Sequence, residues 1–284
     1  MRQKIKEIIE KKILEACVYT GEKRTKQRAI SASSIKGDNL QWVLKYRYGM
    51  IDDEKVSQSQ IGTLVHAGLE EALKGDDKII VEQRLQIDLK DDFVLSGAFD
   101  ALIEYEPDMF AIIDHKTVKH KVIAKLDKEG KDSPYSIQQR IYKHLLIKTE
   151  PEKYNESNVS MFLNLLIKDG AVHMGTPDHV IYEIEDEWTT QEIEKLLSDR
   201  VDSLLPYIED DKLMPEDCDN KFWIRAKGKK AVPGRCLHWC SVSDHCPWYK
   251  SYNKGQAYSK QKSENNILKS MISRSRDKNK DIRI

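Results

Sequence analysis

The chain has 284 residues, and its 47 Lys and Arg against 47 Asp and Glu give a formal net charge of zero. With 33% charged and 39% apolar residues, the composition excludes a membrane-embedded or disordered chain and predicts a soluble globular protein with a buried core. The first residues alternate charge with Ile and lack the apolar centre of a signal peptide, which predicts a cytoplasmic location.

Helices dominate the N-terminal quarter, where apolar residues recur at helical spacing. The first predicted helix covers residues 3–17. A second begins after the N-capping residues 31–34 and includes Tyr46. A third covers residues 57–73 and ends before Gly75.

After residue 78 the pattern changes to strands. These are predicted over 79–81, 85–89, 93–105 and 109–118, with Pro107 in the turn between the last two. A helix over 134–148, strands over 159–167 and 179–184, and a helix over 187–208 follow. This order predicts an α/β or α+β fold with a mixed central β-sheet flanked by helices.

Positive charge gathers at both ends of the chain. Residues 1–28 and residues 257–284 each carry a net charge of +5, so the middle carries −10. Basic arms around an acidic body suit a protein that contacts phosphate while its own carboxylates hold divalent cations. Tails that only keep the protein soluble are the alternative interpretation.

The strongest chemical signal comes from the hairpin around Pro107. Antiparallel pairing there matches residues whose numbers sum to about 214 or 215, which places Asp100 beside Asp114. Asp114 and Lys116 share one face of their strand, and His115 points to the other. Two carboxylates can hold a divalent cation such as Mg²⁺ against a phosphate. The ammonium group of Lys116 can orient the attacking water or neutralise the charge that develops during phosphodiester hydrolysis. A strand-end cap at Asp100 and a surface ion pair between Asp114 and Lys116 are the plain structural alternative.

Two helical patterns accompany the hairpin. Gly62, His66 and Glu70 lie at four-residue spacing on one helix face, where His66 can ligate a metal or contact phosphate. Gln138 and Tyr142 lie one turn apart, where an amide and a phenol can hold a nucleic-acid strand or the catalytic lysine. The structural alternatives are a hydrogen-bonded core histidine and a polar helix face beside a core tyrosine.

In this order, the patterns resemble the RecB-like branch of the PD-(D/E)XK nuclease superfamily over about residues 30–250. Its Ser-rich helix start, G-x-x-x-H, G-x-x-D, D-x-K and Q-x-x-x-Y motifs match residues 31–34, 62–66, 97–100, 114–116 and 138–142. The resemblance implies a restriction-endonuclease-like core, with a catalytic site that includes Lys116, Gln138 and Tyr142. The implied metal ligands are His66, Asp100, Asp114 and the carbonyl of His115. The third acidic position holds Asp rather than the commoner Glu.

Four of the five cysteines fall within residues 218–246. Cys236, Cys240 and Cys246 form a C-x₃-C-x₅-C run, and Cys218 lies upstream of them. Four thiolates are what an iron–sulfur cluster or a structural zinc ion requires. Cysteines that merely pack beside neighbouring Trp residues are the alternative.

Many nucleases that this chain resembles, the CRISPR-associated exonucleases among them, carry a [4Fe-4S] cluster held by three C-terminal cysteines and one upstream of the nuclease motifs. The usual upstream position here holds residues 36–39 without a cysteine, so Cys218 is the predicted fourth ligand and Cys17 the fallback. Zinc with four cysteines, or with His238 or His245 in place of one, stays open. The cysteine spacing also resembles that of exonuclease-like proteins of tailed phages.

The leading hypothesis is a Mg²⁺- or Mn²⁺-dependent deoxyribonuclease in a bacterial or phage-infected cell. Specifically, we expect an exonuclease that acts on DNA ends or single strands in recombination, repair or phage DNA processing. A restriction-type endonuclease, a nuclease of CRISPR adaptation, and a nuclease-fold module that binds DNA without cutting it are the alternatives. The presence of Asp100, Asp114 and Lys116 together argues against the non-cleaving module.

The predicted organisation has four parts. A basic N-terminal helix and linker cover residues 1–29, and the nuclease core covers 30–210. A cysteine metal-binding segment packed on that core covers 211–250, and a basic flexible tail covers 251–284.

Overall fold

The computed structural model describes residues 28–49, 60–169, 178–216, 223–224, 232–233, 236 and 240–252. The chain divides into two compact units, residues 1–49 with 56–216 and residues 50–55 with 217–284. The helix expected over 3–17, the C-terminal tail from residue 253 onward, Cys17 and Cys218 lie outside the described residues. Among the described helices, none is long and apolar enough to cross a membrane.

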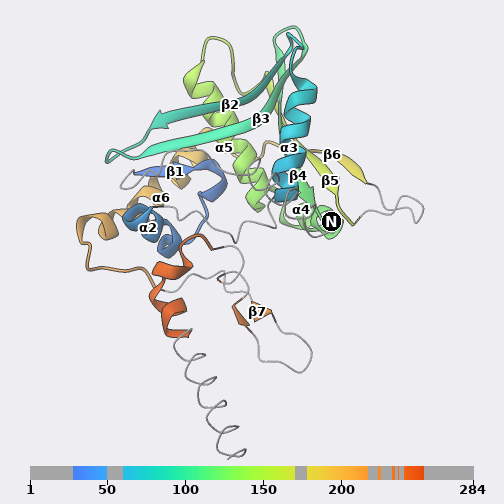
Figure 1. Ribbon diagram of the computed structural model, residues 1–284. Helices are drawn as coiled ribbons and strands as arrows, with labels where there is room; N and C mark the ends of the chain where they lie inside the picture. Colours follow the sequence, from blue (N-terminus) through green and yellow to red (C-terminus); the bar gives the residue numbers. More distant parts are fainter. Residues whose placement is uncertain are drawn as a thin grey trace, which may run out of the picture. The chain divides into compact units, whose positions relative to one another are not determined.

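A mixed β-sheet forms the centre of the first unit (Figure 1). Its strands are β1 (Ala29–Ser31), β2 (Ile79–Asp88), β3 (Val94–Glu106), β4 (Met109–Val118), β5 (Val159–Ile167) and β6 (His179–Glu183). The order is β1-β3-β4-β5-β6. Strand β2 pairs with the edge of β3 opposite the one that pairs with β1 and β4. The pairs β1/β3 and β4/β5 are parallel and the others antiparallel. The mixed sheet flanked by helices that the sequence predicts is confirmed.

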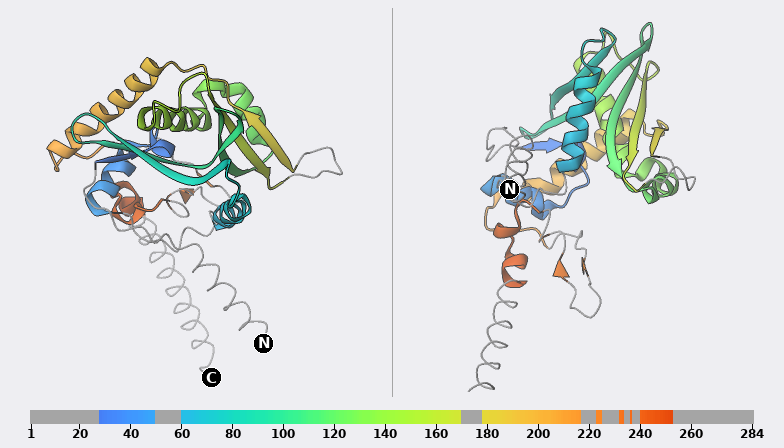
Figure 2. Two further views of the ribbon diagram at one scale, coloured as in Figure 1. Left: turned by 90° about the horizontal axis from the view of Figure 1, so that it is seen from above. Right: turned by 45° about the vertical axis from the view of Figure 1, so that its right-hand side comes forward.

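Helices cover both faces of this sheet. They are α2 (Asn39–Tyr48), α3 (Gln60–Leu73), α4 (Lys121–Glu129), α5 (Pro134–Thr149) and α6 (Thr190–Glu209), with short 3₁₀ turns η1 (Ala32–Ser34) and η3 (Gly130–Asp132). In the left view of Figure 2, α3 and α5 lie on opposite sides of the sheet. The larger apolar core joins the sheet to α2, α5 and α6, and a smaller one joins α4 to β5. One face of the sheet therefore packs against α5 and its neighbours, and α3 covers the other face.

Most predicted elements form close to their expected ends. β4 and β5 have the predicted bounds, and α5 begins at Pro134 after the Ser133 cap. The long helix after residue 187 starts later, at Thr190, because Thr189 and Glu192 form a reciprocal capping box. The two short strands expected over 79–89 are one strand, β2, since β3 pairs with it on both sides of Glu82.

One local prediction is wrong, and one helix was not predicted. The serines at 31–34 do not cap α2 directly. Ser31 and Ser34 hydroxyls bond to each other at 2.6 Å, and the Ser34 carbonyl accepts the Gly37 N–H, so the chain turns before α2 begins at Asn39. Helix α4, whose short apolar stripe includes the buried Leu126, was not predicted from the sequence.

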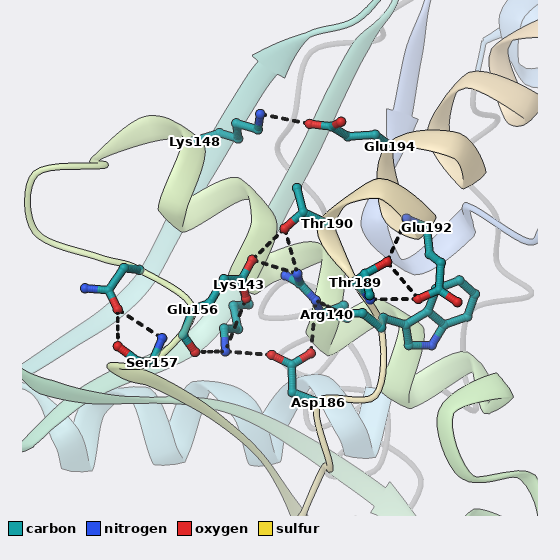
Figure 3. Close-up of polar contacts among 12 residues, drawn as sticks. Arg140, Lys143, Lys148, Glu156, Ser157, Asp186, Thr189, Thr190, Glu192 and Glu194 are labelled. Carbon is teal, nitrogen blue, oxygen red and sulfur yellow. Dashed lines mark hydrogen bonds and ion pairs between the residues drawn. The ribbon is translucent and has the colours of Figure 1, made fainter.

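Helix α5 is buried on all sides from Ser136 to Leu146, although this stretch carries the cationic side chains of Arg140 and Lys143. Arg140 and Lys143 are only 1% and 2% exposed, and both contact Glu156 and Asp186, as Figure 3 shows. Lys143 Nζ also donates to the Glu156 carbonyl at 2.7 Å. Buried charges need such partners because an unpaired ion in the interior is costly. The cluster ties the middle of α5 to the loops before β5 and before α6.

Candidate active site

The candidate site lies where β3 and β4 part. The paired register of this hairpin ends at Ala101 opposite Ile113, which is the register the sequence predicts. On the same edge of β3, β1 pairs only with residues 94–96. Residues 97–100 thus lie between the stretches paired with β1 and with β4, while β4 continues beside β5. The fork places Asp100 and Asp114 at its corner.

Asp100 joins three elements at this corner. Its Oδ2 accepts a hydrogen bond of 2.6 Å from the backbone N–H of His115, and its Oδ1 lies 3.4 Å from Nδ1 of His66 on α3. Burial would raise the pKa of Asp100, but the contact with His66 and the backbone N–H of His115 outweigh it and lower that pKa. The same contact with Asp100 raises the pKa of His66. Asp100 is therefore a stable carboxylate beside an imidazole.

Asp114 and Lys116 form the second part of the site. Asp114 is 2% exposed, and its Oδ2 lies 2.6 Å from Nζ of Lys116. Burial raises the pKa of Asp114 to about 6, and the negative charge of Asp100 adds to this, although Lys116 opposes it. The plain alternative of a surface ion pair does not apply, because Asp114 is buried.

Helix α5 contributes Gln138 and Tyr142, whose side chains bond to each other. Nε2 of Gln138 donates to the Tyr142 hydroxyl at 2.5 Å, and burial together with the charge of Asp114 raises the pKa of Tyr142. The tyrosine ring lies against β3 at Gly97, where an added Cβ would come within 2.8 Å of Cε1 of the ring. The glycine of the G-x-x-D pattern is thus explained by the close approach of Tyr142.

His115 sits on the opposite face from Asp114 and Lys116, as expected from strand alternation. Its ring is buried and bonds through Nδ1 to Nδ2 of Asn164 at 2.8 Å, and Oδ1 of Asn164 bonds to Nε2 of His179 at 2.6 Å. Burial lowers the pKa of His115. Sequence reasoning missed Asn164 and His179, although a single Asn within the apolar run of β5 is an available signal.

Sequence reasoning also missed Glu82. It lies on β2 across from Asp100, with a backbone φ of 48°, between the paired residues Val81 and Gln83. Burial and the nearby charge of Glu70 raise the pKa of Glu82, while contact with Lys74 lowers that of Glu70. These carboxylates add negative charge beside Asp100.

The residues fit a hard divalent cation in their chemistry. Two carboxylates and an imidazole are suitable donors for Mg²⁺ or Mn²⁺, and a buried carboxylate such as Asp114 gains from a cation beside it. Within the described part of the chain, no three His, Cys, Asp or Glu side chains already converge as a metal site. Instead Asp100 faces His66, and Asp114 faces Lys116.

The predicted cysteine centre belongs to the second unit. Of its residues, Cys236 and Cys246 are buried and Cys240 is partly buried. Cys246 follows the 3₁₀ turn η5 (Ser243–His245), and its backbone N–H donates to the Ser243 carbonyl. Cys218 and His238 lie outside the described residues, so the ligand set stays a prediction.

Comparisons with known proteins agree with the geometry of the first unit. A family model described as the PD-(D/E)XK nuclease superfamily matches residues 77–247. The crystal structure of SSO0001 aligns with a TM-score of 0.50 and 19% sequence identity, covering 86% of this chain and 97% of that chain. At this identity the likeness shows a shared fold alone. No curated protein matches the chain.

Proposed function

Because the chain belongs to the PD-(D/E)XK nuclease superfamily, we propose that it is a Mg²⁺- or Mn²⁺-dependent deoxyribonuclease of the RecB-like branch. The observation that supports this most is the gathering of Asp100, Asp114 and Lys116 at the fork between β3 and β4. A nuclease-fold module that only binds DNA would not need a buried carboxylate paired with a lysine at this point.

His66, Asp100, Asp114 and the carbonyl of His115 are the residues that would hold the cation. When bound there, the cation supplies Lewis-acid polarisation of a phosphoryl oxygen and a lower pKa for an attacking water. The carboxylates of Asp100 and Asp114 fix its place at the fork, since each is anchored by a protein contact. His66 must be neutral to serve as a ligand, because a metal binds the unprotonated ring nitrogen.

Lys116 supplies the positive charge that the reaction needs. Its ammonium group already lies 2.6 Å from Asp114, so it reaches the centre of the site. There it orients the attacking water and neutralises charge that develops on the phosphate in the transition state. The hydrogen-bonded side chains of Gln138 and Tyr142 line the site on the α5 side, where they hold the lysine or the nucleic-acid strand in place.

We further propose that the substrate is DNA and that the enzyme is an exonuclease, working from ends or on single strands in recombination, repair or phage DNA processing. Incubation of the purified full chain with end-labelled linear and closed-circular DNA, with Mg²⁺, Mn²⁺ or EDTA, tests this. Loss of linear DNA alone supports an exonuclease. Cutting of circles would instead support a restriction-type or CRISPR-adaptation endonuclease, and a mobility shift without cutting would support a binding module.

For the second unit we propose a metal centre held by Cys218, Cys236, Cys240 and Cys246. The burial of Cys236 and Cys246 supports it, since closely spaced buried cysteines are typical of metal ligands. A [4Fe-4S] cluster is the first choice, by the resemblance to RecB-like nucleases, and structural zinc is the alternative.

A further inference from the structure

Asn164 is a buried amide in the middle of an apolar strand. Its neighbours in β5 are Leu163 and Leu165, both fully buried, and Asn164 itself is only 8% exposed. Burying an amide is unfavourable unless hydrogen bonds replace those to water, whereas a leucine would pack here without that cost. The contacts that Asn164 makes should therefore account for its presence.

Those contacts run across three strands on one face of the sheet. Asn164 lies directly opposite His115 in the register of β4 and β5. Its Nδ2 lies 2.8 Å from Nδ1 of His115, and its Oδ1 lies 2.6 Å from Nε2 of His179 on β6. With the amide in this orientation, Nδ1 of His115 accepts, and Nε2–H of His179 donates. His179 thus fixes which way the amide of Asn164 points.

His115 depends on this amide for its side-chain position. Nε2 of His115 is buried and has no hydrogen-bond partner among the described residues. The ring packs edge-to-face near His66, with 6.0 Å between centroids. Its contact with Asn164 is therefore the directional interaction that selects its rotamer and holds the strand at this residue.

The backbone of His115 is the link between the two acidic halves of the site. Its N–H donates to Asp100, its carbonyl is a proposed metal ligand, and its chain neighbours are Asp114 and Lys116. At this position β4 has already left β3, so β5 is the strand that supports it. A shift of the His115 side chain would move a ligand and tilt both neighbours.

We propose that Asn164 is a positioning residue for metal binding, acting through His115, with His179 orienting its amide. The inference rests on the proposed function, since it concerns the cation held by Asp100 and Asp114. Partners that orient metal ligands from behind are worth about 10- to 100-fold in metal affinity. We expect an effect of that size from Asn164, although it touches neither the cation nor the substrate.

The test measures binding of Mn²⁺ alone, by electron paramagnetic resonance or calorimetry, to the folded full chain. We expect Asn164→Leu to weaken Mn²⁺ binding by about 10- to 100-fold. Asn39→Leu is the matched control, because it removes an amide that bonds to the Ser203 carbonyl on α6, away from the site. It should leave Mn²⁺ affinity unchanged. If the leucine variant does not fold, Asn164→Ser, which cannot bridge the two rings, replaces it with the same expected direction.

A double-mutant cycle with His115→Leu separates positioning from general damage. If Asn164 acts through His115, Asn164→Leu should weaken Mn²⁺ binding little further in the His115→Leu background. Additive losses, or unchanged Mn²⁺ affinity in folded Asn164→Leu, would overturn the inference. Failure of the wild-type chain to bind Mn²⁺ would instead refute the proposed metal site itself, so the two failures are distinguishable.

Discussion

The carboxylate of Asp100 accepts a hydrogen bond of 2.6 Å from the backbone N–H of His115, at a point where the β3/β4 ladder has already ended. The side chain takes over from the missing ladder bond and keeps the two strands together at the fork. Because Asp114 and Lys116 flank His115, the same hydrogen bond sets the distance between the two acidic halves of the site.

Gly97→Ala should impair the site through Tyr142. The new Cβ would lie 2.8 Å from the tyrosine ring and 2.9 Å from Leu145, too close for either to remain in place. We expect a loss of about 1–3 kcal/mol in unfolding free energy, as for other overpacked cores, together with reduced nuclease activity.

The matched control for this change is Gly68→Ala. Gly68 lies on α3, and nothing lies within 4 Å of an added Cβ there. Alanine should stabilise the helix by up to about 1 kcal/mol. Urea unfolding and a nuclease assay on both variants check the prediction, and equal behaviour of the two would show that the contact between Gly97 and Tyr142 is unimportant.

Asp114 should make the metal-free protein less stable at neutral pH. Its folded pKa of about 6 lies above the ordinary value of 3.8, so the stability it contributes is present below pH 3.8 and lost as the pH rises through 6. The full loss corresponds to about 3 kcal/mol for a shift of this size. In EDTA, Asp114→Asn should therefore melt at a higher temperature than wild type at pH 7.5.

At pH 4 the same comparison should show little difference, since Asp114 is then largely protonated in the folded wild type. Mn²⁺ should raise the melting temperature of the wild type at pH 7.5 and have much less effect on Asp114→Asn. A variant that is less stable than wild type in EDTA at pH 7.5 would mean that the ion pair with Lys116 outweighs the burial of Asp114.

The buried cluster on α5 should be sensitive to loss of either acid. Asp186→Asn leaves Arg140 and Lys143, both nearly fully buried, with fewer negative partners. We expect a loss of about 2–4 kcal/mol in unfolding free energy, toward the range for broken buried pairs. Asp199→Asn breaks an exposed pair with Lys195 and should cost less than about 0.5 kcal/mol. Similar losses in the two variants would contradict the assigned role of the cluster.

The sequence predicted the fold and the hairpin register well because both follow from local patterns. Runs of mostly apolar residues on either side of Pro107 define β3, β4 and their turn, and the turn position then determines which residues face each other. The D-x-K spacing places Asp114 and Lys116 on one face for the same reason. These features need no knowledge of the rest of the chain.

The parts that were missed depend on contacts between distant segments. Asn164 and His179 reach His115 only after β5 and β6 have joined the sheet, and no pairing rule gives their partners in advance. Glu82 lies beside Asp100 because β2 joins β3 there. The turn after Ser34 was also missed, because serine hydroxyls can either cap a helix or bond to one another. Here the hydroxyls of Ser31 and Ser34 bond to each other instead of capping α2.

The cysteine centre gives a prediction that needs no activity assay. Anaerobically purified protein should be brown and hold about four iron atoms per chain if Cys236, Cys240 and Cys246 bind a [4Fe-4S] cluster with a fourth ligand. Colourless protein with one zinc ion per chain would show that the cysteines hold zinc rather than an iron–sulfur cluster. Protein without iron or zinc that stays folded when Cys240 is changed to Ser would refute a metal centre.

In the proposed function, the residues at the fork between β3 and β4 hydrolyse DNA with the help of a divalent cation. Single-turnover cleavage of end-labelled DNA tests this most directly. Wild type should cleave with Mg²⁺ or Mn²⁺ and stop in EDTA. Asp114→Ala and Lys116→Ala should be slower by about 10³-fold while still folded and still binding DNA. Lys148→Ala, which breaks an exposed pair with Glu194, should cleave like wild type. Near-normal cleavage by folded Asp114→Ala or Lys116→Ala, or wild-type cleavage that persists in EDTA, would contradict the account.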